Sequence, residues 1–166
     1  MRQNVTAESP TEHHPLDTVP EGVRGEATLS LRRSPQIGGR SSSTGDDRWV
    51  GHLRGVCRAQ LRFWGLADLM DNAQLLVSEL VTNALRHGDS QRVTCRLLFA
   101  DDLVTIEVDD GSPGRRANLT TAGPEDESGR GMLIVATLAS AWGVGPDGTK
   151  TWCTLAVPAD PGRGRR

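Results

Sequence analysis

The sequence lacks most features that mark a secreted, membrane or metal-binding protein. It has no Tyr, a single Lys and three widely spaced cysteines, Cys57, Cys95 and Cys153. An odd number of distant cysteines argues against a disulfide framework and a CxxC metal site, and it suits a reducing cytoplasm. No apolar run approaches the ~20 residues of a membrane span, and no basic segment followed by an apolar stretch indicates a signal peptide. We therefore expect a cytoplasmic protein without a membrane segment.

Charge of one sign is not in excess either. Lys and Arg total 19 and Asp and Glu total 21, which gives a formal net charge of −2. Without excess positive charge the chain cannot neutralise many phosphates, so we expect no direct binding to nucleic acid. Residues 1–25 carry three prolines and no apolar period, and residues 159–166 form a basic tail rich in Gly. We expect disorder in both tails and one domain over 26–158.

The spacing of apolar residues predicts the elements of this domain. Alternation predicts strands over 26–33, 93–99, 103–109 and 149–157, and helical spacing predicts helices over 46–65, about 71–88 and 132–142. Residues 111–128 show no period, which is typical of a functional or a disordered loop. The order of elements fits an α+β fold, with a mixed sheet covered on one face by helices.

Glu79 and Asn83 stand four residues apart on the second predicted helix, so both project from one face. A carboxamide oxygen suits Mg²⁺, which keeps waters and phosphate oxygens as its other ligands. A carboxylate one turn earlier can orient or deprotonate a hydroxyl or a water near that metal. The alternative is an ordinary polar pair on a solvated helix face.

Asp110 follows the predicted strand over 103–109, and the period of two places it on the inward face with the apolar residues of that strand. A carboxylate there needs hydrogen-bond donors, because burial without a partner is costly. An adenine amino group is a suitable donor, and Gly111, Ser112 and Gly114 would let the backbone turn sharply beside a ligand. The alternative is a solvated turn.

Two further segments suit phosphate. Gly129, Arg130 and Gly131 precede the helix expected from Met132, and a helix start offers free N–H groups and the positive end of the dipole. The third Gly of a GxGxxG fingerprint is absent, and no GxxxxGK[ST] element exists anywhere in the chain. The segment over 149–151, with two threonines and the only Lys, could also reach a terminal phosphate. The alternatives are a flexible helix start and a charged turn.

Together and in this order, these segments resemble the ATP-binding Bergerat (GHKL) fold of histidine kinases, gyrase and mismatch-repair ATPases. LLVSELVTNALRHG, VDDGSPG and GRGM are similar to the N-box and the two glycine boxes of the anti-sigma factor/serine-protein kinase family, in its stand-alone actinomycete form. The resemblance covers about residues 27–157. It implies an α+β two-layer sandwich, in which a mixed, mostly antiparallel sheet carries helices on one face.

The resemblance implies ATP and Mg²⁺ as cofactors and assigns roles to single residues. Glu79 would be the catalytic base that activates a protein hydroxyl, Asn83 would coordinate Mg²⁺, and Asp110 would hold the adenine amino group. The remaining residues expected to bind the cofactor are His87, Ser112, Gly114, Gly129, Arg130, Gly131, Met132 and Thr151.

The resemblance also implies partners. It predicts an anti-sigma factor that binds a sigma factor and phosphorylates a Ser or Thr of a STAS-type anti-sigma factor antagonist. Members of the family commonly pair as homodimers. The alternative is a non-catalytic ATP-binding module that controls a partner protein through its lid, the loop over 111–128, which could close over the ligand.

Overall fold

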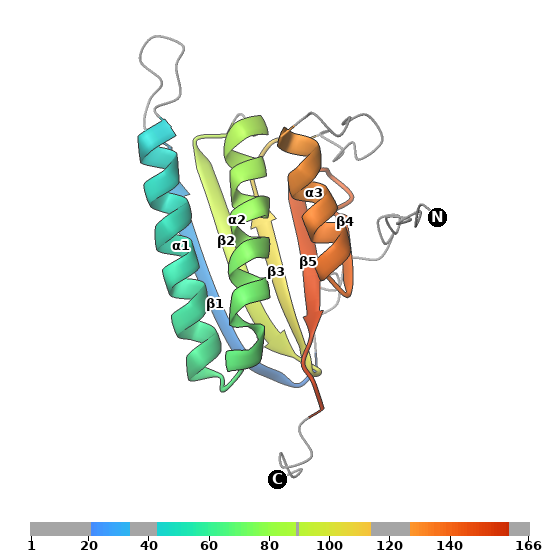
Figure 1. Ribbon diagram of the computed structural model, residues 1–166. Coiled ribbons are helices and arrows are strands. Elements are labelled where there is room, and N and C mark those ends of the chain that lie inside the picture. Colours follow the sequence, from blue (N-terminus) through green and yellow to red (C-terminus); the bar gives the residue numbers. More distant parts are fainter. Residues whose placement is uncertain (1–20, 34–42, 89, 114–126, 160–166) are drawn as a thin grey trace, which may run out of the picture.

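The computed structural model describes residues 21–33, 43–88, 90–113 and 127–159, and these form two layers (Figure 1). A sheet forms one layer, and the described helices cover one of its faces. The elements in chain order are β1 (Val23–Arg32), α1 (Ser43–Phe63), the short 3-10 helix η1 (Ala67–Leu69), α2 (Met70–His87), β2 (Arg92–Ala100), β3 (Leu103–Asp109), α3 (Glu127–Leu138), β4 (Ala141–Val144) and β5 (Lys150–Ala156). The tails expected to be disordered lie mainly in residues 1–20 and 160–166, outside the described residues.

The sheet has the strand order β1-β2-β3-β5-β4, and every pairing between its described strands is antiparallel. The predicted α+β class, the one-sided helix layer and the mostly antiparallel sheet are confirmed, whereas the parallel pairing that a mixed sheet would include does not occur among the described strands. The reason lies in the connection between β1 and β2. Helices α1 and α2 run in opposite directions and return the chain to the edge that it left (Figure 1). A single crossover helix would have made these two strands parallel.

The hydrophobic core fills the space between the helices and the sheet. Each helix contributes a stripe at intervals of three and four residues, and the central strands contribute their helix-facing side chains. Buried members of the core include Leu53, Cys57 and Leu61 of α1, Leu76, Leu80 and Val81 of α2, and Val93, Leu97, Ile106 and Cys153 of the strands. The burial of apolar surface therefore fixes which face of α2 is left to carry polar side chains.

The third helix differs from its prediction at both ends. It was expected over 132–142, but α3 spans Glu127–Leu138, and Trp142 lies on the short strand β4. The indole of Trp142 is 2% exposed, and the residue pairs with Cys153 of β5. A buried strand of four residues is too short for alternation to distinguish it from a helical continuation. At the N-terminus, β1 begins at Val23, three residues before the predicted strand.

The three cysteines are free and buried, as their spacing in the sequence indicated. Burial raises the pKa of Cys57 and of Cys95 to about 12, and it raises the pKa of Cys153 as well. Thiols that remain protonated are poor nucleophiles, so these cysteines act as small core residues. Among the described residues, none of the helices has both the length and the apolar character that crossing a membrane requires.

Candidate functional site

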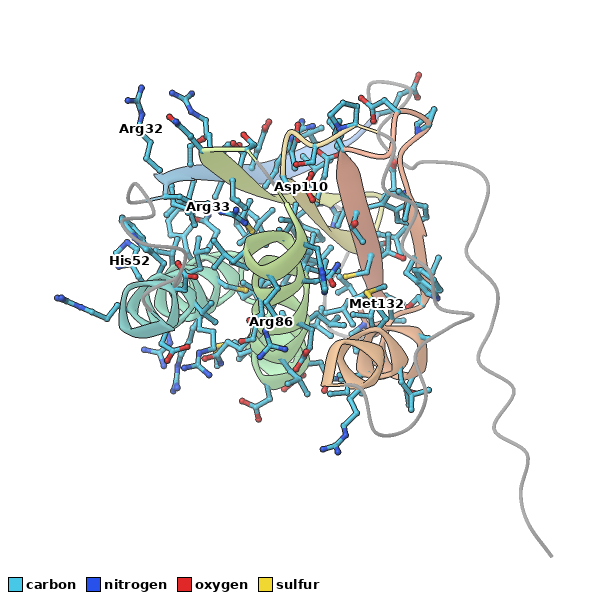
Figure 2. All side chains as sticks on the ribbon, turned by 90° about the horizontal axis from the view of Figure 1, so that it is seen from above. Arg32, Arg33, His52, Arg86, Asp110 and Met132 are labelled. Carbon is cyan, nitrogen blue, oxygen red and sulfur yellow. The ribbon has the colours of Figure 1, made fainter. Side chains whose placement is uncertain are left out.

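Four elements bring polar residues to one edge of the molecule. The C-terminal end of α2, the end of β3, the first turns of α3 and the start of β5 all lie at the upper edge in Figure 1. Figure 2 views this edge from above and shows Asp110 on the sheet side of the end of α2, with Arg86 on its outward side. Segments that are far apart in the sequence therefore converge where the motifs were expected to act.

A small, open cleft separates α2 from α3 at this edge. Its lining residues are Glu79, Thr82, Asn83, Arg86 and His87 of α2 and Gly131 and Met132 of α3. The structure thus brings together five of the residues predicted to form the site, namely Glu79, Asn83, His87, Gly131 and Met132. Asp110 is not part of the lining.

The position of Glu79 and Asn83 follows from the packing of α2. Leu76, Leu80 and Val81 are buried against the sheet. Glu79 and Asn83 are half-buried, because they lie at the border of that apolar stripe, on the side of α2 that faces α3. The helix therefore presents one carboxylate and one carboxamide, a turn apart, to the same cleft.

Gly131 allows α3 to approach Glu79 closely. A Cβ added at Gly131 would lie 2.5 Å from Oε2 of Glu79, which is closer than real Cβ contacts allow. The carboxylate of Glu79 thus rests directly on the backbone of α3. The absence of a side chain at residue 131 therefore sets where the carboxylate of Glu79 lies, and it leaves the backbone of α3 open to the cleft.

The carboxyl group of Glu79 is shifted toward its protonated form. Burial raises its pKa above the ordinary value of 4.5, and the positive charge of Arg86 offsets part of that rise. A carboxylate with a raised pKa accepts a proton more readily, which is the property that a general base near neutral pH needs. The environment of Glu79 therefore suits proton transfer.

The segment over 129–131 lies inside α3, which differs from its predicted position before the helix. It was expected to precede the third helix, but α3 begins at Glu127, so Gly129, Arg130 and Gly131 lie within its first two turns. Only the first four N–H groups of a helix lack an internal partner. The N–H groups available to a phosphate are therefore those of residues 127–130. Gly131 is not one of them, and its role is to leave space beside α3 because it has no side chain. Arg130 is exposed at this helix start.

Asp110 is held by backbone bonds at the end of β3. Its N–H donates to the carbonyl of Thr149 (3.0 Å), and its Oδ1 accepts from the N–H of Ser112 (2.8 Å). Ser112 is 6% exposed, and Gly111 has a φ of +66° that a residue with a side chain rarely adopts. The turn predicted after this strand is therefore present and orients Asp110. Gly114, the last residue of that motif, lies outside the described residues.

Gly88 packs against Asp110. A Cβ added at Gly88 would lie 2.9 Å from Cβ of Asp110 and 2.6 Å from the carbonyl oxygen of Ala84. The side chain of Asp110 therefore faces the helix layer, as the alternation along β3 indicated. The sequence pattern identified Gly88 only as the end of a helix, because its contact with Asp110 joins residues that are distant in the chain.

The segment over 149–151 divides between the two faces of the sheet. Lys150 pairs with Asp109, and its Nζ lies 3.8 Å from Oε1 of Glu107 on the face away from the helices. This arrangement favours the alternative, in which Lys150 belongs to a charged turn and strand start, over a contact with phosphate. Thr151 pairs with Val108 and is half-buried on the helix side. It lies beside the site edge without lining the cleft itself.

The sequence reasoning missed Thr82 and Arg86. Both lie on the face of α2 that carries Glu79 and Asn83, at three and seven residues after Glu79. That spacing is the helical period, so a count along the helix face would have found them. Arg86 matters for the electrostatics, because its charge acts on the carboxyl of Glu79.

The donor set fits Mg²⁺ bound together with a phosphate ligand. In the described ranges, no group of three or more His, Cys, Asp or Glu side chains could enclose a metal ion. Mg²⁺ commonly takes one or two protein oxygens and completes its shell with waters and substrate phosphates. The carboxamide of Asn83, in the cleft beside Glu79, can supply such an oxygen.

Comparison with known proteins agrees with this geometry. No curated protein matches the chain. The family model described as a histidine kinase-like ATPase domain matches residues 46–155, a range that contains α2, β3, α3 and every residue lining the cleft. The chain therefore belongs to the histidine kinase-like ATPase domain family.

Proposed function

We propose that this protein binds ATP with Mg²⁺ and transfers the γ-phosphoryl group to a Ser or Thr of another protein. The observation that carries the proposal is the half-buried carboxylate of Glu79. Its pKa is raised, and it shares one cleft with the carboxamide of Asn83 at the start of α3. A base of this kind, beside a metal ligand and a helix N-terminus, is suited to phosphoryl transfer.

Each residue has a defined part in this proposal. Asn83 would hold Mg²⁺, and the bound ion would supply positive charge that stabilises the phosphate oxygens. The first N–H groups of α3, together with Arg130, would bind the phosphates. Asp110 accepts a hydrogen bond from the adenine amino group. His87 and Met132 border the cleft on either side.

The transfer step balances without a further reactant. Glu79 takes the proton of the Ser or Thr hydroxyl, and the hydroxyl oxygen bonds to the γ-phosphorus. The bond between the γ-phosphorus and the β–γ bridging oxygen breaks, and ADP leaves with that electron pair. The products are a phosphoserine or phosphothreonine and ADP, and the proton on Glu79 returns to water.

The partners in this proposal come from the resemblance of the three motifs. An anti-sigma factor of this type would bind a sigma factor and would phosphorylate a STAS-type antagonist. Phosphorylation would release the antagonist, and the unphosphorylated antagonist would displace the sigma factor. Partner exchange would then depend on the chemistry of the cleft.

The test is a transfer assay with the full chain, γ-labelled ATP, Mg²⁺ and a purified STAS-type antagonist domain. We expect label on a Ser or Thr of the antagonist, and loss of that label with Glu79→Gln while ATP still binds. Thr137→Ala is the matched control, because Thr137 is exposed on α3 and bonds only within its helix. ATP binding without any transfer would contradict the kinase proposal and favour the non-catalytic module.

A further inference from the structure

Arg33 connects the edge of the sheet to the end of α2. It follows β1 directly, and its guanidinium donates three hydrogen bonds to carbonyl oxygens of α2 and its cap. Nη1 donates to Gly88 (2.5 Å), and Nη2 donates to Ala84 (2.6 Å) and Leu85 (2.5 Å). Figure 2 shows that Arg33 and Asp110 both lie on the sheet side of that helix end. One side chain thus donates to two carbonyl groups in the last turn of α2 and to the carbonyl group of its cap.

The end of α2 needs such a partner. The last four carbonyls of a helix have no internal donor, and they carry the negative end of the helix dipole. Gly88 caps α2 in an extended conformation, with only its own N–H bonded back to Ala84. A planar guanidinium can serve several carbonyls at once, whereas the single ammonium of Lys cannot reproduce this fork.

Arg33 is itself fixed in the sheet. Its backbone N–H donates to the carbonyl of Gln91 (2.8 Å), which extends the ladder between β1 and β2 by one bond. Its side chain is half-buried between the sheet edge and the helix. The position of the end of α2 is therefore tied to the sheet by three bonds from a fixed residue.

The group that Arg33 holds is the one against which Asp110 packs. A Cβ at Gly88 would lie 3.2 Å from Cγ of Asp110, so the Gly88 peptide borders that carboxyl group closely. A shift of Gly88 by a few tenths of an ångström would change the space that Asp110 occupies. Arg33, Gly88 and Asp110 thus form one continuous contact from the β1 edge to the end of β3.

We propose that Arg33 is a positioning residue for nucleobase recognition, acting on Asp110 through Gly88. This inference rests on the proposed binding of ATP. Arg33 lies outside the residues 46–155 that match the family model, so no role passes to it from that match. Its effect is on which base is bound, because Asp110 is the group expected to accept the adenine amino hydrogen.

The experiment compares ATP with purine riboside triphosphate, which lacks the 6-amino group, by titration calorimetry on the full chain with Mg²⁺. We expect the wild type to bind ATP about 10- to 100-fold more tightly, as the loss of one hydrogen bond to a charged group predicts. Arg33→Gln should reduce this ratio to roughly 3 or less, because Asp110 is no longer aligned. Arg33→Lys should give an intermediate ratio.

Arg32→Gln is the matched control, because the preceding residue of β1 carries the same charge but is exposed. It should retain the wild-type ratio. All proteins are compared at temperatures well below their melting midpoints. If Arg33→Gln does not fold, the ratio of the two affinities in Arg33→Lys tests the inference, and an unchanged ratio overturns it. A variant that weakens both nucleotides equally would show that Arg33 only stabilises the helix, which overturns the inference.

The two proposals fail in different ways. A wild type that binds neither nucleotide would overturn the proposed ATP binding, and this inference with it. A wild type that prefers ATP, beside Arg33 variants with an unchanged preference, would overturn the positioning role alone. A fall in the ratio with Arg33→Gln and not with Arg32→Gln would support it.

Discussion

Two pairs of glycines in the helix layer differ in how closely other atoms approach them. Gly51 and Gly55 lie inside α1, and a Cβ added at either would have nothing within 4 Å. Gly88 ends α2 and Gly131 lies in α3, and a Cβ there would come within 2.9 Å of Asp110 or 2.5 Å of Glu79. The same residue type is therefore free in one region and in tight contact in the other.

The difference shows where close approach is required. Glycine inside a helix costs roughly 0.5–1 kcal/mol relative to alanine, because the unfolded chain loses more freedom. At Gly131 this cost is offset by geometry, since the missing side chain lets a site carboxylate lie against the helix backbone. At Gly51 and Gly55 of α1, no described atom lies close enough to require the absence of a side chain. Substitution by alanine should therefore have opposite effects in the two regions.

Gly88→Ala should have the largest effect. The new methyl group would meet the carbonyl of Ala84 at 2.6 Å and the side chain of Asp110 at 2.9 Å, so backbone must move. We expect a loss of about 1–3 kcal/mol in the free energy of unfolding, as for other overpacked sites. ATP affinity should fall at least ~10-fold, since Asp110 is displaced. Urea unfolding and calorimetric titration measure the two effects.

A control separates overpacking in general from overpacking at the site. In Gly25→Ala the added Cβ would lie 2.1 Å from Nε1 of Trp64, at the other end of the layer between α1 and β1. This variant should lose stability to a similar degree while its ATP affinity, measured on folded protein, is unchanged. Equal losses of affinity in both variants would show that Gly88 has no specific link to the site.

Gly131→Ala should affect transfer more than binding. Here the clash is with Oε2 of Glu79, the end of a flexible side chain, so the carboxylate can rotate away. We expect ATP affinity within about threefold of wild type and a transfer rate reduced roughly 10- to 100-fold, which is part of the ~10²- to 10⁴-fold that a general base contributes. Steady-state kinetics separates kcat from KM. A raised KM with unchanged kcat would place Gly131 in nucleotide binding instead.

Glu79→Gln should change the dependence of stability on pH. Because burial raises the pKa of Glu79, the folded state binds more protons than the unfolded state between pH 4.5 and the raised pKa. Wild-type stability therefore falls as the pH rises from 4.5 through the raised pKa, and Glu79→Gln lacks this fall. The variant should melt higher than wild type at pH 7, and the gain should vanish below pH 4.5. A constant difference between the two proteins at every pH would contradict the raised pKa.

Much of the fold was predictable because the elements carry strong periods. The stripe of α2 and the alternation of β2 and β3 placed these elements within a few residues of their observed ends. The antiparallel pairing of β1 with β2 was not predictable, because it depends on the direction of the two helices that connect these strands. Strand β4 was missed because four residues carry too little pattern.

The site was predictable to the extent that its residues lie on one element. Glu79, Asn83 and His87 follow from the period of α2, and the structure places them in one cleft. Contacts between elements could not be read from the chain. Gly88 beside Asp110 and Arg33 beside Gly88 each join residues more than 20 positions apart, and only the folded sheet brings them together.

Gly51→Ala and Gly55→Ala should have the smallest effects and the opposite sign. The added methyl groups meet no atom within 4 Å, so each variant should gain about 0.5–1 kcal/mol in the free energy of unfolding from helix propensity alone. ATP affinity and transfer should stay at wild-type values, because α1 contributes no residue to the cleft. Urea unfolding of the single and double variants measures the gains, which should add. A loss of stability in either variant would show that another part of the protein lies close to these glycines. A gain of stability with a loss of partner binding would show that a partner protein does. Either result would mean that Gly51 and Gly55, like Gly88 and Gly131, are in close contact with other atoms.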